Sequence, residues 1–191
     1  HALHLVSTSM PFAQRLNAGI VASALGLHEH TLLRDAVSSL RAASTELISA
    51  LQAHNTQAQI VVASERRTAK PASSQEMSMG DGAAAMLVGQ GELIARCLGT
   101  HTQYADFVDQ FRETGHAHDY GWEERWAREE GYLKIAVDAI RTTLKKHNIQ
   151  ATAIDHFVMP ATLPKINEAV AKRAGINAAA VARPENESVG D

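Results

Sequence analysis

Two neighbouring stretches of the sequence decide the fold, IVVASERR at residues 60–67 and GDGAAAMLV at residues 80–88. The first begins with a nearly continuous apolar run, Ile60 to Ala63, which is typical of a strand buried on both faces. The second opens with a Gly-Asp-Gly turn and continues as an alanine-rich run, which indicates that the backbone passes close to another element. We therefore expect a strand, a polar loop and a further strand.

On either side of these stretches, strands and helices alternate. This alternation predicts an α/β layered fold with a largely parallel sheet. The apolar spacing and the glycine and proline positions predict strands at 3–8, 35–37, 60–63, 92–98 and 154–159, and helices at 12–25, 38–52, 133–147 and 164–174. Gly26 and Gly175 are expected to close two of the helices.

The composition is that of an ordinary soluble globular protein, with 191 residues, 45% hydrophobic and 20% charged. The net charge of −3 comes from interspersed charges, so we expect neither a nucleic-acid partner nor a membrane. The single cysteine, Cys97, excludes an intrachain disulfide and predicts a reducing, cytoplasmic location. The chain begins with His1 in place of Met and stops at 188–191 without a closing helix, so we expect an interior piece of a longer protein.

Ten histidines raise the possibility of a metal site. The pairs His28/His30 and His116/His118 have the i, i+2 spacing that places two side chains on one face of a strand. Neither pair has a third ligand at a recognisable spacing, so solvated loop histidines are favoured and no metal is predicted. A metal-dependent hydrolase on His116 and His118 is the weakest alternative.

Other candidate groups have simpler structural interpretations. Cys97, in the expected strand 92–98, is interpreted as a buried, inert thiol, because no helix start or neighbouring histidine would lower its pKa. The charged run at 123–130 is expected to be a solvated helix with ion pairs. The segment 104–132 holds most of the aromatic residues and is expected to cover a cleft or a partner surface.

The stretches 60–67 and 80–88, with Pro71 and Glu76 between them, resemble the thiolase superfamily. The nearest branch holds 3-hydroxy-3-methylglutaryl-CoA synthase and 3-oxoacyl-carrier-protein synthase III. There a strand ends in Ala-Ser-Asp-x-Arg, and a Gly-Asp-Gly-Ala-x-Ala turn leads into the next strand. The residues that match this turn are Gly80, Asp81, Gly82 and Ala83. The run 120–132 is similar to an insert of synthase-like proteins that act on CoA thioesters.

The resemblance implies a layered αβαβα fold of two similar halves, covered only in part by this chain. Residues 1–90 would end the N-terminal half, and residues 91–191 would begin the C-terminal half. It also implies a Claisen-type acyltransferase that acts on acyl-CoA or acyl-carrier thioesters, with coenzyme A entering as substrate and no separate cofactor. A homodimer or a partner subunit is expected.

The catalytic residues of the family are not matched. The family cysteine would fall within residues 39–41, Ser-Leu-Arg, and the family histidine would fall on Pro160. The family Gly-Asn would fall on residues 190–191, Gly-Asp. At the helix start, Ser39 and Arg41 are the candidate substrate-binding residues, as contacts for an anion or a carbonyl oxygen. Alternatively, Ser39 caps the helix and Arg41 forms a structural ion pair.

Two functions therefore remain open. In the first, the chain is part of a synthase-like acyltransferase. In the second, it is a non-catalytic thiolase-like subunit that binds an acyl thioester or scaffolds a partner enzyme.

Overall fold

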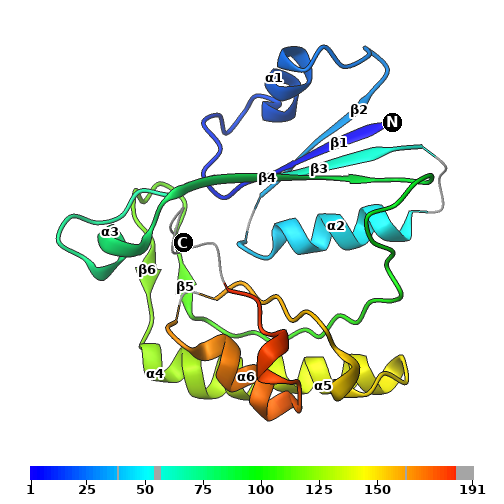
Figure 1. Cartoon of the computed structure of the whole chain (residues 1–191). Helices are drawn as coiled ribbons and strands as arrows, with labels where there is room; N and C mark the ends of the chain where they lie inside the picture. Colours follow the sequence, from blue (N-terminus) through cyan, green and yellow to red (C-terminus); the bar gives the residue numbers. More distant parts are fainter. Residues whose placement is uncertain (38, 54–56, 162, 184–191) are drawn as a thin grey trace. The chain divides into compact units, whose positions relative to one another are not determined.

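The computed structural model describes residues 1–37, 39–53, 57–161 and 163–183 (Figure 1). Two compact units make up the chain. Unit 1 comprises His1–Arg67 and Gly80–Leu98, and unit 2 comprises Thr68–Met79 and Gly99–Asp191. Within the described residues, no helix has the length and apolarity that crossing a bilayer requires. The division of the family halves at residue 90 stays a prediction.

Unit 1 is a four-stranded sheet with two helices. Its elements are β1 (Ala2–Val6), α1 (Asn17–Ala24), β2 (Leu32–Ala36), α2 (Ala42–Gln52), β3 (Gln59–Arg66) and β4 (Asp81–Val88). The strand order is β2-β1-β3-β4, with β1 parallel to both β2 and β3, and β4 antiparallel to β3. The predicted α/β fold with a largely parallel sheet is therefore confirmed.

The two helices of unit 1 lie on opposite faces of its sheet (Figure 1). On one face, Leu3 and Leu5 of β1 pack with Ala18 of α1. On the other face, Val6 and the residues of α2 and β3 form a second small cluster, whose buried members are Val6, Ala42, Ala50 and Val61. All five residues of β1 are buried, because the strand is central and covered on both sides.

The carboxylate of Asp35, in β2, fixes the start of α1. It accepts hydrogen bonds from the backbone amides of Asn17 and Ala18, both at 2.7 Å, and from the Asn17 side chain at 2.9 Å. The same side-chain amide donates to the carbonyls of Phe12 and Arg15. The helix predicted over 12–25 therefore begins only at Asn17. At its other end, the positive φ of Gly26, 61°, agrees with the predicted cap.

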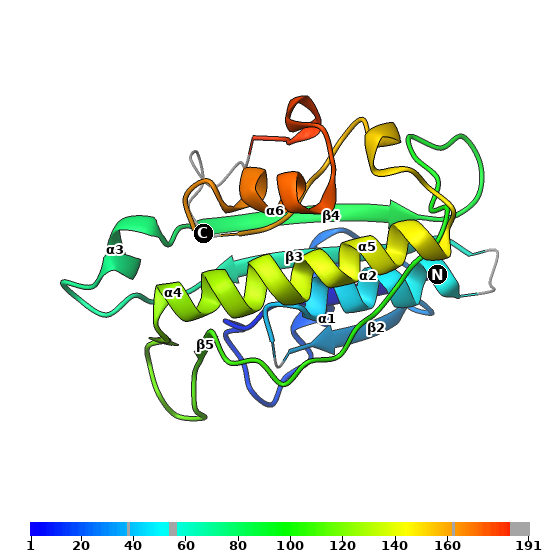
Figure 2. The same cartoon turned by 90° about the horizontal axis from the view of Figure 1, so that it is seen from below.

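Unit 2 is mainly helical. A long helix consists of α4 (Glu124–Trp126), the π-helical segment η1 (Ala127–Ala136) and α5 (Val137–Lys146), which follow one another without a break (Figure 2). The remaining elements are α3 (Ser74–Ser78), a two-stranded antiparallel ribbon of β5 (Gln110–Phe111) and β6 (Tyr120–Gly121), α6 (Ile166–Ala174), and the short 3₁₀ turns η2 (Ala151–Ala153) and η3 (Ala178–Ala180). The helices predicted at 133–147 and 164–174 are confirmed.

The core of unit 2 forms where α6 packs on the long helix. Val137 of α5 and two residues of α6, Ile166 and Val170, are almost completely buried there. The predicted surface ion pairs of the long helix are present, since Arg128 contacts Glu124 and Lys134 contacts Glu130 at the i, i+4 spacing. These exposed pairs contribute little to stability.

Two predicted strands are absent. Residues 92–98 form no strand, and their apolar side chains Ile94 and Leu98 are exposed, because no neighbouring strand is there to pair with them. The interpretation of Cys97 as buried is wrong for the same reason, since this thiol is exposed. In place of the strand at 154–159 there is a single parallel bridge between Phe157 and Val181.

We expect Asp35→Asn to lower the free energy of unfolding by about 1–2 kcal/mol, because the start of α1 loses a charged acceptor. Burial works to raise the pKa of Asp35, but hydrogen bonds from the Asn17 side chain and the amides of Ala18 and Asn17 outweigh it and lower the pKa. The carboxylate therefore stabilises the fold above its unfolded-state pKa, and this contribution is lost as the pH falls through the folded-state pKa.

Urea unfolding of the two proteins, followed by circular dichroism at neutral and at acidic pH, tests this prediction. The difference in stability between wild type and variant should shrink in acid. A difference that stays constant with pH would contradict the assigned role of the Asp35 carboxylate.

Gly131→Ala is expected to destabilise unit 2 by about 1–2 kcal/mol through overpacking. A β-carbon at this position of η1 would lie 2.9 Å from Cε1 of Phe107. The Phe107 ring is itself stacked on Trp126, with 5.5 Å between ring centroids, so it has little freedom to move. A loss of stability would identify overpacking as the cause, because a Gly to Ala substitution within a helix ordinarily stabilises the protein by about 1 kcal/mol.

Thermal unfolding measures this effect, and Gly82→Ala is the matched control because its β-carbon would meet nothing within 4 Å. A Gly131 variant that is as stable as the wild type would show that Phe107 does not occupy this position.

Candidate functional site

The carboxyl ends of three parallel strands meet at one edge of the unit 1 sheet. Val6 of β1 pairs with Ala36 of β2 and with Ala63 of β3, so these strands reach the edge in register. β3 continues for three more residues, paired only with β4. In open α/β sheets, ligands bind in the crevice outside the carboxyl ends of the strands. This carboxyl edge is therefore the candidate site.

The carboxylate of Glu65 organises this edge. It lies in the extension of β3 and accepts hydrogen bonds from the Thr8 amide at 2.6 Å, the Thr8 hydroxyl at 3.0 Å and the Ser9 hydroxyl at 2.9 Å. The Ser9 hydroxyl in turn accepts the backbone N–H of Arg66 at 2.7 Å, and Ser7 Oγ accepts the amide of Ser9 at 3.0 Å. The loop after β1 is thus held to the end of β3.

The predicted substrate-binding residues lie at the same edge, between β2 and α2. Arg41 occupies the N-cap position of α2 in a right-handed helical conformation, and no side chain caps this helix. The Ser39 carbonyl accepts the amide of Ala42 at 3.0 Å. The alternative in which the Ser39 hydroxyl caps the helix is therefore wrong. Both side chains are exposed, and within the described residues Arg41 has no ion pair. Their role in substrate binding stays a prediction; Ser38 lies outside the described residues.

Comparison with known proteins gives a consistent result. No family model matches the sequence. The hydroxymethylglutaryl-CoA synthase of Picrophilus torridus is 26% identical over 161 residues, which are 82% of this chain and 45% of that protein. Among solved structures, 3-oxoacyl-(acyl carrier protein) synthase III of Pseudomonas aeruginosa superposes with a TM-score of 0.79 at 21% identity, over 99% of this chain and 62% of that one.

The fold of the chain is thiolase-like, and its sequence is similar to that of a hydroxymethylglutaryl-CoA synthase. A further similar structure is a Cys-to-Ser variant of Xanthomonas campestris OleA with bound lauric acid and lauroyl-CoA, with a TM-score of 0.80 at 21% identity over 99% of this chain and 63% of that one. The chain spans about half the length of the curated relative and less than two thirds of these structures.

The chemistry of this thiolase-like edge differs from the family pattern at the start of α2. Residues 39–41, Ser-Leu-Arg, lie where the family cysteine is expected, and the central residue, Leu40, is 48% exposed. Cys97 cannot replace that thiol, because it follows β4, which runs antiparallel and ends beside Gln59 at the amino ends of the other strands. In unit 2, Pro160 lies where the family histidine is expected, ahead of α6. Residues 190–191 lie outside the described residues.

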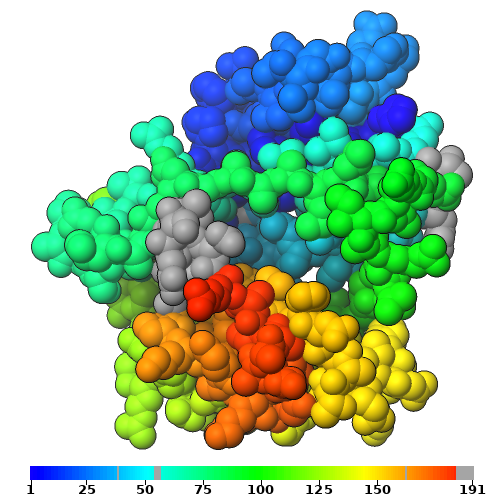
Figure 3. All heavy atoms as spheres, in the orientation of Figure 1, coloured from blue at the N-terminus to red at the C-terminus, as the bar shows by residue number. Residues whose placement is uncertain are grey.

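The Gly-Asp-Gly-Ala motif of the thiolase-like fold occupies the start of β4. Asp81 pairs with Arg66, and Ala83 pairs with Ser64, so the motif borders the extension of β3 that carries Glu65. The expected close approach of a further element is not found at Gly82. Residues of β4 are exposed along almost the whole strand (Figure 3).

The histidine pairs form no metal centre. Within the described part of the chain, no three His, Cys, Asp or Glu side chains come close enough together to hold a metal ion. The rings of His28 and His30 lie 4.9 Å apart on an exposed loop. In unit 2, His116 contacts Glu113, whereas His118 Nδ1 faces the carbonyl oxygen of Thr68.

Sequence reasoning missed the Glu65 network. Its signal was present, because a Ser-Thr-Ser run follows the first strand and a carboxylate follows the apolar core of the third. Only the strand register, with Val6 opposite Ala63, shows that the Ser-Thr-Ser run and the Glu65 carboxylate lie side by side.

Glu65→Gln is expected to loosen the loop after β1, because the amide loses one of the two acceptor oxygens. We expect amide hydrogen exchange at Thr8, measured by NMR, to become at least about tenfold faster, with a loss of about 1–2 kcal/mol in the free energy of unfolding. Glu92→Gln, at an exposed position of the same unit, is the matched control. Unchanged exchange at Thr8 in the Glu65 variant would contradict the network.

Proposed function

We propose that the chain binds an acyl-CoA or acyl-carrier thioester at the carboxyl edge of unit 1 and that its own side chains do not carry the acyl group covalently. The similar proteins support the ligand class. They include a hydroxymethylglutaryl-CoA synthase complexed with CoA and the OleA variant that holds lauroyl-CoA. The strand ends, the Glu65-held loop and the start of α2 form the edge at which such a ligand would bind.

The observation that supports non-covalent binding most directly is Leu40 at the start of α2. A thiol at a helix N-terminus is favoured as the thiolate by the positive end of the helix dipole. Leucine keeps the apolar surface of such a site and removes the nucleophile. Ser39 and Arg41 flank this position and would contact the thioester carbonyl or an anionic group of the carrier.

The alternative is a Claisen-type acyltransferase. It is supported by the relatives, which are synthases by name. In that reaction a nucleophile of the same protein would first take the acyl group from CoA. Under either proposal we expect a homodimer or a partner subunit, in the reducing conditions of the cytoplasm.

Intact-protein mass spectrometry after incubation with lauroyl-CoA distinguishes the two proposals. With the wild type we expect saturable binding, measured by calorimetry, and no increase in protein mass. A mass increase equal to one acyl group, together with turnover, would contradict non-covalent binding.

A thiol introduced at the start of α2 tests where the thioester binds. In the Leu40→Cys protein, also carrying Cys97→Ser, the new thiolate should attack the acyl carbonyl of lauroyl-CoA. The CoA thiolate leaves and takes up a proton, and the protein gains one acyl group at position 40. Cys97→Ser alone is the matched control and should gain none. A correctly folded Leu40 variant that binds lauroyl-CoA without acylation would place the thioester elsewhere.

A further inference from the structure

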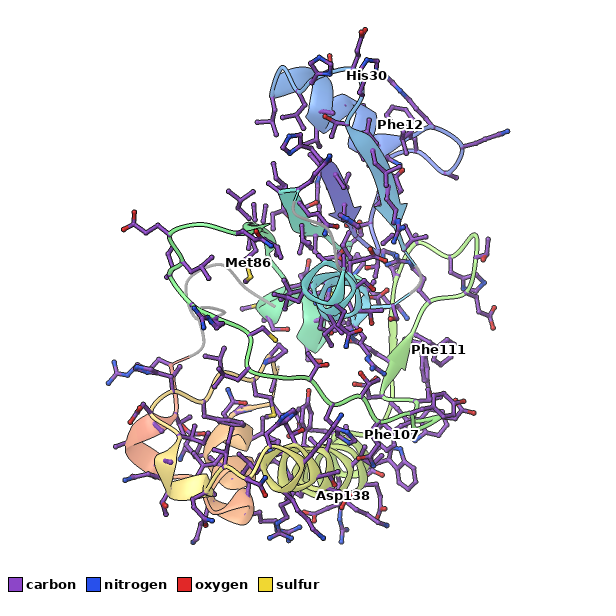
Figure 4. All side chains as sticks on the ribbon, turned by 90° about the vertical axis from the view of Figure 1, so that its right-hand side faces the viewer. Phe12, His30, Met86, Phe107, Phe111 and Asp138 are labelled. Atoms are coloured by element: carbon purple, nitrogen blue, oxygen red, sulfur yellow. The ribbon has the colours of Figure 1, made fainter. Side chains whose placement is uncertain are left out.

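The start of α6, in unit 2, has two backbone donors without acceptors. This nine-residue helix packs beside the long helix of the same unit (Figure 4). No side chain caps it at Lys165, and its first helical hydrogen bond runs from the Ala169 amide to the Lys165 carbonyl. Among the described residues, the backbone amides of Asn167 and Glu168 have no acceptor. Free amides at a helix start attract an oxygen atom of a ligand, but by themselves they do not define a site.

A buried acceptor lies at the same helix start. Asn167 is only 7% exposed, and its side-chain Nδ2 donates to the Met159 carbonyl at 3.0 Å. Because only the nitrogen of a side-chain amide can donate, Oδ1 faces away from that carbonyl. Oδ1 is buried, and no group in the described part of the chain donates to it. Side chains of a helix tilt toward its N-terminus, so this oxygen is directed at the open first turn.

These atoms together select a neutral group. The free amides need an acceptor, whereas Oδ1 of Asn167 needs a donor. A carboxylate or a phosphate dianion supplies only acceptors, and it would also face the Glu168 carboxylate in the same turn. The segment that leads into α6 adds half-buried apolar side chains, Met159, Ala161 and Leu163. A carboxamide carries a carbonyl oxygen beside an N–H group, so it satisfies both requirements without bringing a charge.

We propose that the start of α6 binds a neutral carboxamide group of a ligand. Its carbonyl oxygen accepts from the free first-turn amides of Asn167 and Glu168, and its N–H group donates to Oδ1 of Asn167. The site lies within unit 2, so it does not rest on the acyl-thioester site proposed for unit 1.

NMR titration of the full chain with acetamide, N-methylacetamide and acetate tests this proposal. The three probes are similar in shape, but acetate has no N–H group and carries a charge. We expect weak, saturable shifts of the Asn167 and Glu168 backbone amide signals with at least one of the two amides, and none with acetate. Tighter binding of acetamide would indicate a primary amide as the natural ligand group, and tighter binding of N-methylacetamide a secondary amide. Either result supports the site.

Substitutions separate the role of Oδ1 from that of the helix start. Asn167→Leu should weaken amide binding by at least about fivefold, the effect of losing one neutral hydrogen bond. Asn177→Leu is the matched control, because it removes an exposed asparagine side chain elsewhere in unit 2 and should leave the affinity unchanged. Glu168→Gln should also leave the affinity for a neutral amide unchanged, whereas it would strengthen the binding of an anion.

The comparison of amide with acetate uses the wild-type protein, so the test stays decisive if the Asn167 variant does not fold. The absence of saturable shifts with both amides would overturn the proposal, since water alone would then satisfy Oδ1 of Asn167. Equal binding of acetate and acetamide, or a folded Asn167→Leu protein that binds amides as tightly as the wild type, would overturn it as well.

Discussion

The carboxyl edge of unit 1 depends on one interaction, the hydrogen bonding of the Glu65 carboxylate to the loop after β1. It is possible because β3 extends beyond the point at which Val6 pairs with Ala63. A carboxylate that accepts an amide and two hydroxyls holds a polar loop that would otherwise be free to move. The same extension carries the pairing with the Gly-Asp-Gly turn, so the family motif and the organising carboxylate belong to one structural feature.

This edge has the backbone arrangement of a thiolase-like protein but not the cysteine expected at the start of α2. The parallel register, the helix after β2 and the antiparallel β4 are those of a thiolase-like protein. The nucleophile is absent at the start of α2, where Leu40 stands, and the one cysteine follows a strand that leads away from the edge. The strand ends are present without a thiol at the start of α2, which is why we propose binding of an acyl thioester without covalent transfer.

Much of unit 1 could be predicted from sequence, because its strands are short apolar runs and its helices have clear periodicity. The predictions were wrong where burial depended on a neighbour. Residues 92–98 have the composition of a strand but no partner to pair with, and the run at 154–159 keeps only one bridge. The helix predicted from residue 12 begins instead at Asn17, where the Asp35 carboxylate accepts the first backbone amides of α1. Asp35 is distant in sequence from this helix start, so local patterns do not reveal the contact. The Glu65 network could not be predicted, because it depends on the register of β1 and β3, which local sequence patterns do not contain.

Hydrogen–deuterium exchange with and without lauroyl-CoA tests the central claim most directly. The account predicts that the ligand protects peptides that cover residues 7–9 and the start of α2, while peptides at the amino ends of the strands exchange as before. Protection confined to other regions, or none at a ligand concentration that saturates binding, would contradict the assignment of the carboxyl edge as the thioester site.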